Sequence, residues 1–115
     1  MTEQDYIELI KGRWPPTYEA EPTPETIAVC ERAVAEFPHS TMLWLMRGDL
    51  IQLSGYEGAP VLLEAERSYR QAITASPSCA EAYEALAHFF DAVVAKPRKA
   101  RQYFHKAWLL RKAMA

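Results

Sequence analysis

The sequence has 115 residues, enough for one domain with a core of its own. Half of the residues are hydrophobic and 24% are charged, as in ordinary globular domains, and the net charge of −2 at pH 7 gives no overall attraction for nucleic acid or acidic membranes. No apolar run approaches the roughly 20 residues of a membrane span, and the opening "MTEQDYIELIKGRW" lacks the basic start of a signal peptide.

The N-terminal part predicts two helices separated by a proline-rich strap. Thr2 and Asp5 have the spacing of a capping box, which predicts a helix over 3–11. The stretch "RWPPTYEAEPTP" (13–24) holds four prolines and cannot be helical in its interior. Thr23 then caps a second helix, which starts at Pro24 and runs to about residue 37.

Four more helices are predicted over the rest of the chain. One runs from about 41 to 54 and ends at the loop "SGYEGAP", and the next covers 61–75 and is stopped by Pro77. Ser78 and Glu81 have capping-box spacing, which predicts a helix over 79–95. Pro97 starts the last helix, which runs nearly to residue 115. The fold class predicted is therefore all-α.

Small, aromatic and proline residues recur at fixed offsets along these helices. The offsets of four, three and five residues occur in Ala65, Tyr69, Ala72 and Pro77, again in Thr26, Cys30, Ala33 and Pro38, and in part in Ala100, Phe104 and Ala107. A second register, six residues after each proline, holds Trp44, Gly48 and Ile51, and then Tyr83, Leu86, Ala87 and Phe90. Two registers that agree indicate an internal repeat.

These residues resemble the tetratricopeptide repeat, whose pattern is W-x2-L-G-x2-Y followed by A-x3-F-x2-A-x4-P. The resemblance implies one domain over 1–115, with three antiparallel helical hairpins stacked as a short right-handed solenoid. An N-terminal helix and strap (1–23) would precede a partial first repeat (24–38), a middle repeat (41–77) and a last repeat (80–113). The sequence departs from the pattern at Arg47, where leucine is usual, and in the long loop "SGYEGAP".

No residue pattern predicts catalysis. The histidines at 39, 88 and 105 have no metal-ligand spacing, and the four glycines form no phosphate loop. We therefore expect no enzyme, no cofactor and no metal.

The resemblance places a binding groove on the first helix of each repeat. Carried over, it points to one set of residues as a candidate partner-binding groove: Met42, Leu45, Asp49, Gln52, Leu53, Glu81, Glu84, His88 and Asp91. The last four share one acidic helical face, which suits a basic or amphipathic protein segment. An ordinary solvated helix face is the alternative.

A second candidate interface comprises Trp14 and Tyr18 in the strap and Trp108, Leu110 and Met114 in the last helix. The strap could pack on its own groove, dock on another molecule or be a flexible linker. Residues 96–115 hold seven Lys and Arg and no acid, which suits an acidic protein partner, an offset homodimer, or a helix end that complements its own dipole. No base-reading module is present, so we expect no nucleic-acid partner.

The function predicted is a protein-interaction module, either an adaptor or a scaffold, that binds a peptide or helix. The two cysteines form no disulfide framework, which suits the cytoplasm. A small secretion-type chaperone that sheathes a helical client is the alternative, and an enzyme is the weakest reading.

Overall fold

Helices make up most of the structure, a computed structural model that describes residues 1–17 and 19–114. The elements are α1 (Glu3–Gly12), α2 (Pro24–Glu36), α3 (Thr41–Leu53), α4 (Leu63–Ala75), α5 (Ala80–His88), the π-helical turn η1 (Phe89–Val93) and α6 (Pro97–Met114). No β-strand occurs within these described residues, so the predicted all-α class is confirmed.

Two predicted helix starts are confirmed by their caps. The Thr2 hydroxyl accepts a hydrogen bond from the backbone N–H of Asp5, and the Asp5 carboxylate accepts one from the N–H of Thr2 at 2.8 Å. Thr23 caps α2 through the N–H of Thr26, and Pro24 is the first helical residue. Both caps satisfy backbone donors that the first helical turn leaves free.

The predicted capping box of Ser78 and Glu81 is wrong. Helix α5 begins at Ala80, and its N-cap is Cys79, whose side chain makes no capping hydrogen bond. Because Ser78 lies in the turn after Pro77, the helix starts one residue later than the pattern requires. Glu81 is therefore the second residue of the helix, where its side chain cannot complete the box with Ser78.

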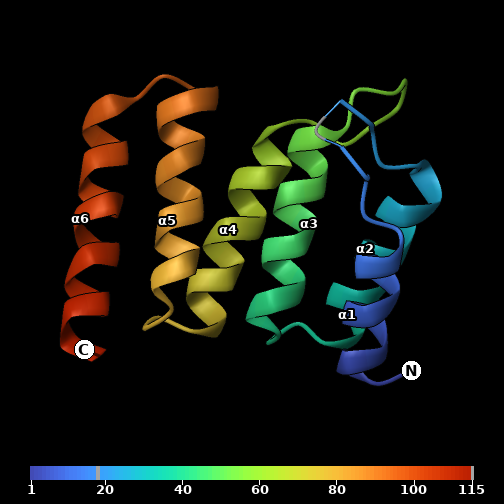
Figure 1. Ribbon diagram of the computed structural model, residues 1–115, viewed down its shortest axis with the longest axis horizontal. Helices are drawn as coiled ribbons and strands as arrows, with labels where there is room; N and C mark the ends of the chain where they lie inside the picture. Colours follow the sequence, from blue (N-terminus) through green and yellow to red (C-terminus); the bar gives the residue numbers. More distant parts are fainter. Residues whose placement is uncertain (18, 115) are drawn as a thin grey trace.

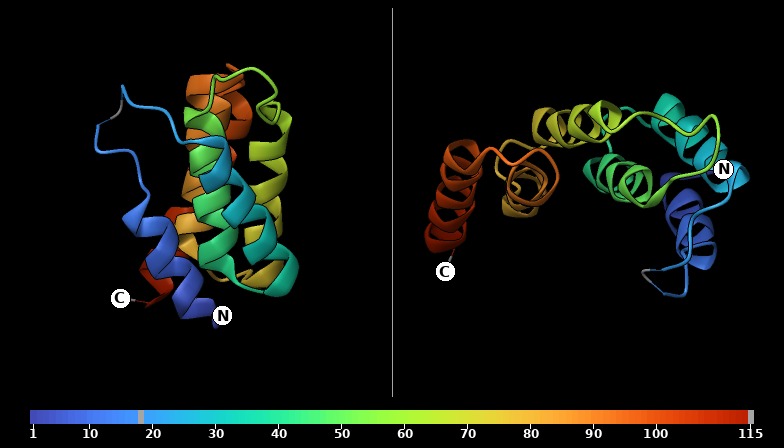
Figure 2. Two further views of the ribbon diagram at one scale, coloured as in Figure 1. Left: turned by 90° about the vertical axis from the view of Figure 1, so that its right-hand side faces the viewer. Right: turned by 90° about the horizontal axis from the view of Figure 1, so that it is seen from above.

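The helices form a curved row. Consecutive helices pack against each other, most extensively α3 with α4 and α5 with α6 (Figure 1). Seen from above, α1, α3 and α5 lie on the inner side of the curve and α2 and α4 on the outer side, while α6 ends the row (Figure 2). We call the side formed by α1, α3 and α5 the inner face.

Small residues allow the close approaches between helices. A methyl group added at Gly48 in α3 would lie 2.6 Å from the Tyr69 ring of α4, which is closer than side-chain carbons approach. Ala65, Ala72 and Ala100 are small residues that are also buried in the core. The Tyr69 ring itself is fully buried and meets Phe89 edge-on, with ring centroids 6.3 Å apart.

Arg47 is buried, with 3% of its side chain exposed, and links three helices. Its Nε donates to the Glu31 carboxylate of α2 at 2.7 Å, and its Nη2 donates to the Glu64 carboxylate of α4 at the same distance. Its Nη1 donates to the Glu64 carbonyl and the Ser68 hydroxyl. The position where the repeat pattern has leucine is thus occupied by a guanidinium whose donors face acceptors on both neighbouring helices.

The helix predicted over 79–95 is an α-helix only as far as His88 and continues as a π-helical turn to Val93. After His88 the chain widens into η1, and the N–H of Val94 bonds the carbonyl of Phe89, five residues back. Phe89 and Phe90 are both buried, the first against Tyr69 and the second stacked on Tyr103 of α6. The wider π-helical turn thus begins at two consecutive residues, Phe89 and Phe90, whose aromatic rings are both buried in the core.

Candidate partner-binding face

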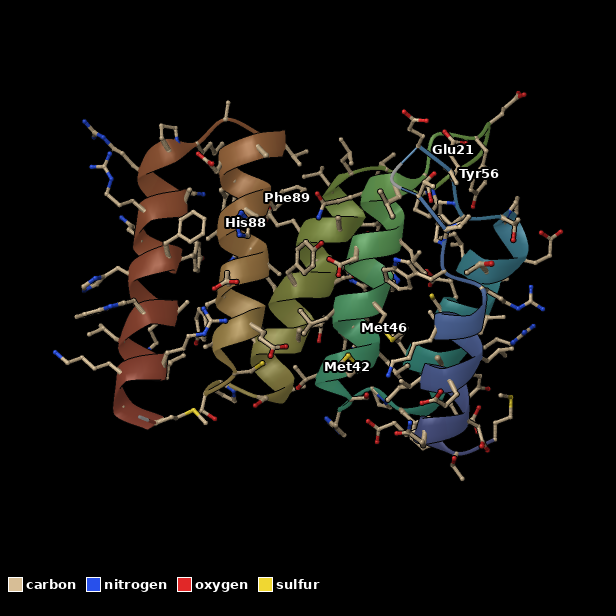
Figure 3. The ribbon with its side chains drawn as sticks, viewed as in Figure 1. Glu21, Met42, Met46, Tyr56, His88 and Phe89 are labelled. Atoms are coloured by element: carbon tan, nitrogen blue, oxygen red, sulfur yellow. The ribbon has the colours of Figure 1, made fainter. Side chains whose placement is uncertain are left out.

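Helix α3 contributes a narrow exposed strip to the inner face. Met42 is 43% exposed and Asp49 is exposed, while Gln52 and Leu53 are half-buried. In Figure 3 the side chains of Met42 and Met46 lie on the side of α3 that faces the viewer, which is the inner face. Met46, which the repeat pattern does not single out, is buried beneath this strip.

Leu45 does not line the surface as predicted. It is only 9% exposed and belongs to the core. Helix α3 packs against α1, α2, α4 and α5, so most of its circumference is covered and eight of its 13 residues are buried. A helix enclosed in this way leaves little surface for a partner, and Leu45 falls on a covered side.

Asp49 is held in place by a tyrosine from the next helix. The Tyr69 hydroxyl donates a 2.6 Å hydrogen bond to the Asp49 carboxylate, and the Gln52 amide donates to the same hydroxyl oxygen. Burial raises the pKa of Asp49, and the bond from Tyr69 offsets part of that rise. The exposed Asp49 carboxylate therefore lies among enough protein atoms for desolvation to disfavour its charged form.

Tyr69 and Arg47 depart from the repeat pattern, and both make polar contacts that were not predicted from the sequence. Tyr69 stands where the pattern has phenylalanine, and its additional hydroxyl is the group that orients Asp49. Arg47 stands where leucine is usual and joins α2, α3 and α4. The sequence feature that could have pointed to both groups is a polar side chain at a position that the repeat pattern keeps apolar.

Helix α5 contributes two acids and a histidine from neighbouring turns. Glu81 and His88 are exposed, and Glu84 is half-buried. Arg111 of α6 forms an ion pair with Glu84, and this hydrogen bond lowers the pKa of Glu84. His88 meets Phe104 of α6 edge-on at 4.9 Å, and its side chain lies on the inner face in Figure 3.

Asp91 is exposed but lies in η1 rather than in α5. The wider π-helical turn changes the angle between successive side chains. The predicted stripe of residues 81, 84, 88 and 91 assumed a regular helix, and only the first three of these residues lie in α5.

A hollow of about 390 Å³ lies where α5 begins and α6 ends. Glu81, Arg111 and Met114 line it together with residues 78–80. It brings together Glu81 from the predicted groove and Met114 from the predicted interface, so these two predicted surfaces meet at this hollow.

The predicted interface residues fall into different environments. Trp14 is half-buried against the core, and Leu110 is half-buried on α6. Trp108 is 54% exposed and Met114 is 78% exposed. Tyr18 lies outside the described residues.

The strap packs beside the loop between α3 and α4. Pro22 is buried, and the Glu21 carboxylate lies so close to Gly55 that a methyl group there would be 2.7 Å from its oxygen. Figure 3 shows Glu21 and Tyr56 near each other at this end. Glu21 therefore meets the loop after α3 rather than the strip of α3 that carries Met42.

Among residues 1–17 and 19–114, no three His, Cys, Asp or Glu side chains are grouped so that they could hold a metal ion. No helix in the described part of the chain has the length and apolar character needed to cross a membrane. No family model matches the sequence, and no curated protein matches it.

Proposed function

We propose that this protein is a protein-interaction module of the tetratricopeptide type, in which three helical hairpins form a short right-handed solenoid. The curved row of helices and the Gly48–Tyr69 contact support this reading. The buried Cys30 and half-buried Cys79 are free thiols, as suits a reducing compartment such as the cytoplasm.

The ligand we propose is a basic amphipathic helix bound to the inner face. The observation that carries this proposal is Asp49, an exposed carboxylate fixed by the buried Tyr69 next to the strip that carries Met42. Among the described residues, no Lys or Arg lies within ion-pair distance of Asp49, so the chain itself does not neutralise it. A lysine or arginine of the ligand would form an ion pair with Asp49, and the apolar side of the ligand helix would cover Met42.

The test compares two labelled helical peptides, one made of leucine and lysine and one of leucine and glutamate. We expect the lysine peptide to bind, as measured by fluorescence anisotropy, and the glutamate peptide not to bind. Asp49→Asn should weaken binding about tenfold, because a charge-assisted hydrogen bond contributes about 1.5 kcal/mol or more.

Glu57→Gln is the matched control, because it removes the same charge from an exposed residue in the loop between α3 and α4. Equal weakening by both substitutions would show that only net charge matters and would contradict the proposed site. Binding of both peptides with equal affinity would contradict the basic ligand.

A further inference from the structure

The C-terminal end of the molecule is a basic surface. Residues 96–114 contain no acid and carry seven cations: Lys96, Arg98, Lys99, Arg101, Lys106, Arg111 and Lys112. Within the described part of the chain, Arg111 is the only one of them that forms an ion pair. The other six charges therefore face solvent or aromatic rings without an acidic partner.

One side of α6 combines these charges with an exposed indole. Arg98, Arg101, His105, Trp108 and Lys112 follow one another at three or four residues, so they share a helical face that we call the basic stripe. The Trp108 ring stacks on His105 at 5.9 Å, and the Lys112 ammonium lies 4.9 Å from its centre. A hollow of about 390 Å³ lies along the first half of the stripe, lined by Arg98, Arg101, Gln102 and His105.

The opposite end of the molecule is acidic. Residues 1–36, which form α1, the strap and α2, hold eight acids against three bases. Some of these acids have partners within the chain: Arg47 pairs with Glu31, Lys11 lies 3.9 Å from Glu8, and the Thr2 N–H donates to Asp5. Asp5, Glu8 and Glu25 are nonetheless exposed at the helix surfaces. We call Asp5, Glu8 and Glu25 the acidic end.

The two charged surfaces lie at opposite ends of the longest dimension. In Figure 1 the row starts with α1 and α2 at one edge and finishes with α6 at the other, and the molecule measures 37 Å along its longest axis. One copy therefore cannot bring its own basic stripe to its own acidic end, whereas a second copy can.

We propose that copies of this protein associate end to end, with the basic stripe of one copy seated on the acidic end of the next. Charge complementarity within a single sequence identifies a second copy as the occupant. The exposed Trp108 supplies apolar area at the centre of the contact. The contact is heterologous, so each added copy presents a free stripe or a free acidic end, and association continues beyond the dimer. This proposal does not depend on what the inner face binds.

Sedimentation velocity over a range of protein concentrations tests the association. At about 0.01 M salt, where charges act over roughly 30 Å, we expect the average mass to rise with concentration above the 13.1 kDa of one chain. At about 1 M salt, where the range falls to roughly 3 Å, we expect only monomer. A wild-type protein that stays monomeric to millimolar concentration at low salt would overturn the proposal.

Two variants identify the surfaces. Arg101→Gln with Lys112→Gln removes two cations of the stripe, and Glu8→Gln with Glu25→Gln removes two of the three carboxylates of the acidic end. Each variant alone should be monomeric at concentrations where the wild type associates. An equimolar mixture should give a species of twice the monomer mass that grows no further, because each variant retains the surface that the other lacks.

The matched control is Lys99→Gln with Lys106→Gln, which removes two charges from the other side of the same helix. These ammonium groups lie over Phe90 and Tyr83. The control should associate like the wild type. Equal loss in the control and the stripe variant, or a mixture that stays monomeric, would overturn the proposal.

A labelled oligonucleotide probes the other polyanion that a basic stripe could bind. Binding that needs Arg101 and Lys112, in a protein that does not self-associate, would assign the stripe to nucleic acid and overturn the end-to-end contact. Circular dichroism of all three variants should show unchanged helix content, because every substituted residue is exposed.

Discussion

Gly48→Ala tests whether the contact between α3 and α4 sets the stability of the molecule. The added methyl carbon would lie 2.6 Å from Cε1 and 2.8 Å from Cζ of Tyr69. The Tyr69 ring is fully buried and its hydroxyl is bonded to Asp49 and Gln52, so it cannot swing aside as a surface side chain would. Either the ring moves and its hydrogen bonds weaken, or α3 and α4 separate.

The expected loss of stability is the sum of two costs and one gain. Overpacking a core costs about 1–3 kcal/mol. Weakening the bond between Tyr69 and Asp49 adds about 1 kcal/mol. Alanine is a better helix former than glycine by about 1 kcal/mol, which offsets part of the cost. We therefore expect the free energy of unfolding to fall by about 1–3 kcal/mol.

Urea denaturation followed by circular dichroism measures this loss. Gly12→Ala is the control, because Gly12 also lies in a helix and no atom of the described residues that the methyl group could strike lies within 4 Å of it. The control should be as stable as the wild type or slightly more so. In the background of Tyr69→Leu, the cost of Gly48→Ala should shrink, since the clashing ring is gone. A Gly48→Ala protein as stable as the Gly12→Ala protein would refute the reasoning.

Three further predictions concern buried and titratable groups. Arg47→Ala should lower the free energy of unfolding by about 3 kcal/mol in urea denaturation, because it breaks a buried charge network, and Arg47→Met should lower it by less. Adding Ser68→Ala to Arg47→Met should recover part of the loss, because the Ser68 hydroxyl that Arg47 bonds would no longer be left unpaired. Burial raises the pKa of Asp49 in the folded state, so its protonated form stabilises the fold below the unfolded pKa and that contribution is lost as pH rises through the folded pKa. Asp49→Asn should therefore gain stability relative to the wild type between about pH 3 and pH 7, and an equal difference at both values would contradict the shift. Burial raises the pKa of Cys30 to about 12, so a thiol reagent should modify Cys79 in the native protein and Cys30 only after unfolding, as counted by mass spectrometry.

The helices could be predicted from the sequence because their ends carry local signals. Thr2 with Asp5 and Thr23 with Pro24 act within one helical turn, so their spacing alone is enough to place α1 and α2. The capping box predicted for Ser78 and Glu81 depends on equally local spacing, so a shift of one residue in the turn after Pro77 was enough to make that prediction wrong.

The candidate site was harder to predict, because its geometry depends on contacts between helices. Leu45 matched the spacing of an inner-face residue, but the number of helices around α3 decides its burial. The bond from Tyr69 to Asp49 joins residues 20 positions apart, and no local rule links them. Asp91 lies in a π-helical turn that the sequence around Phe89 did not indicate.

The shallow burial of α6 has a consequence for the order in which the molecule opens. Only Ala100 and Ala107 of its 18 residues are buried, whereas α3 buries eight of 13. Local opening needs the least free energy where the fewest apolar contacts must separate. Amide hydrogens of α6 should therefore exchange with solvent well before those of α3, and each such fluctuation would briefly uncover Phe90 and the aromatic contacts beneath the helix. Opening of α6 would thus precede opening of α3, and any contact that holds α6 in place would slow the exchange of its own amides.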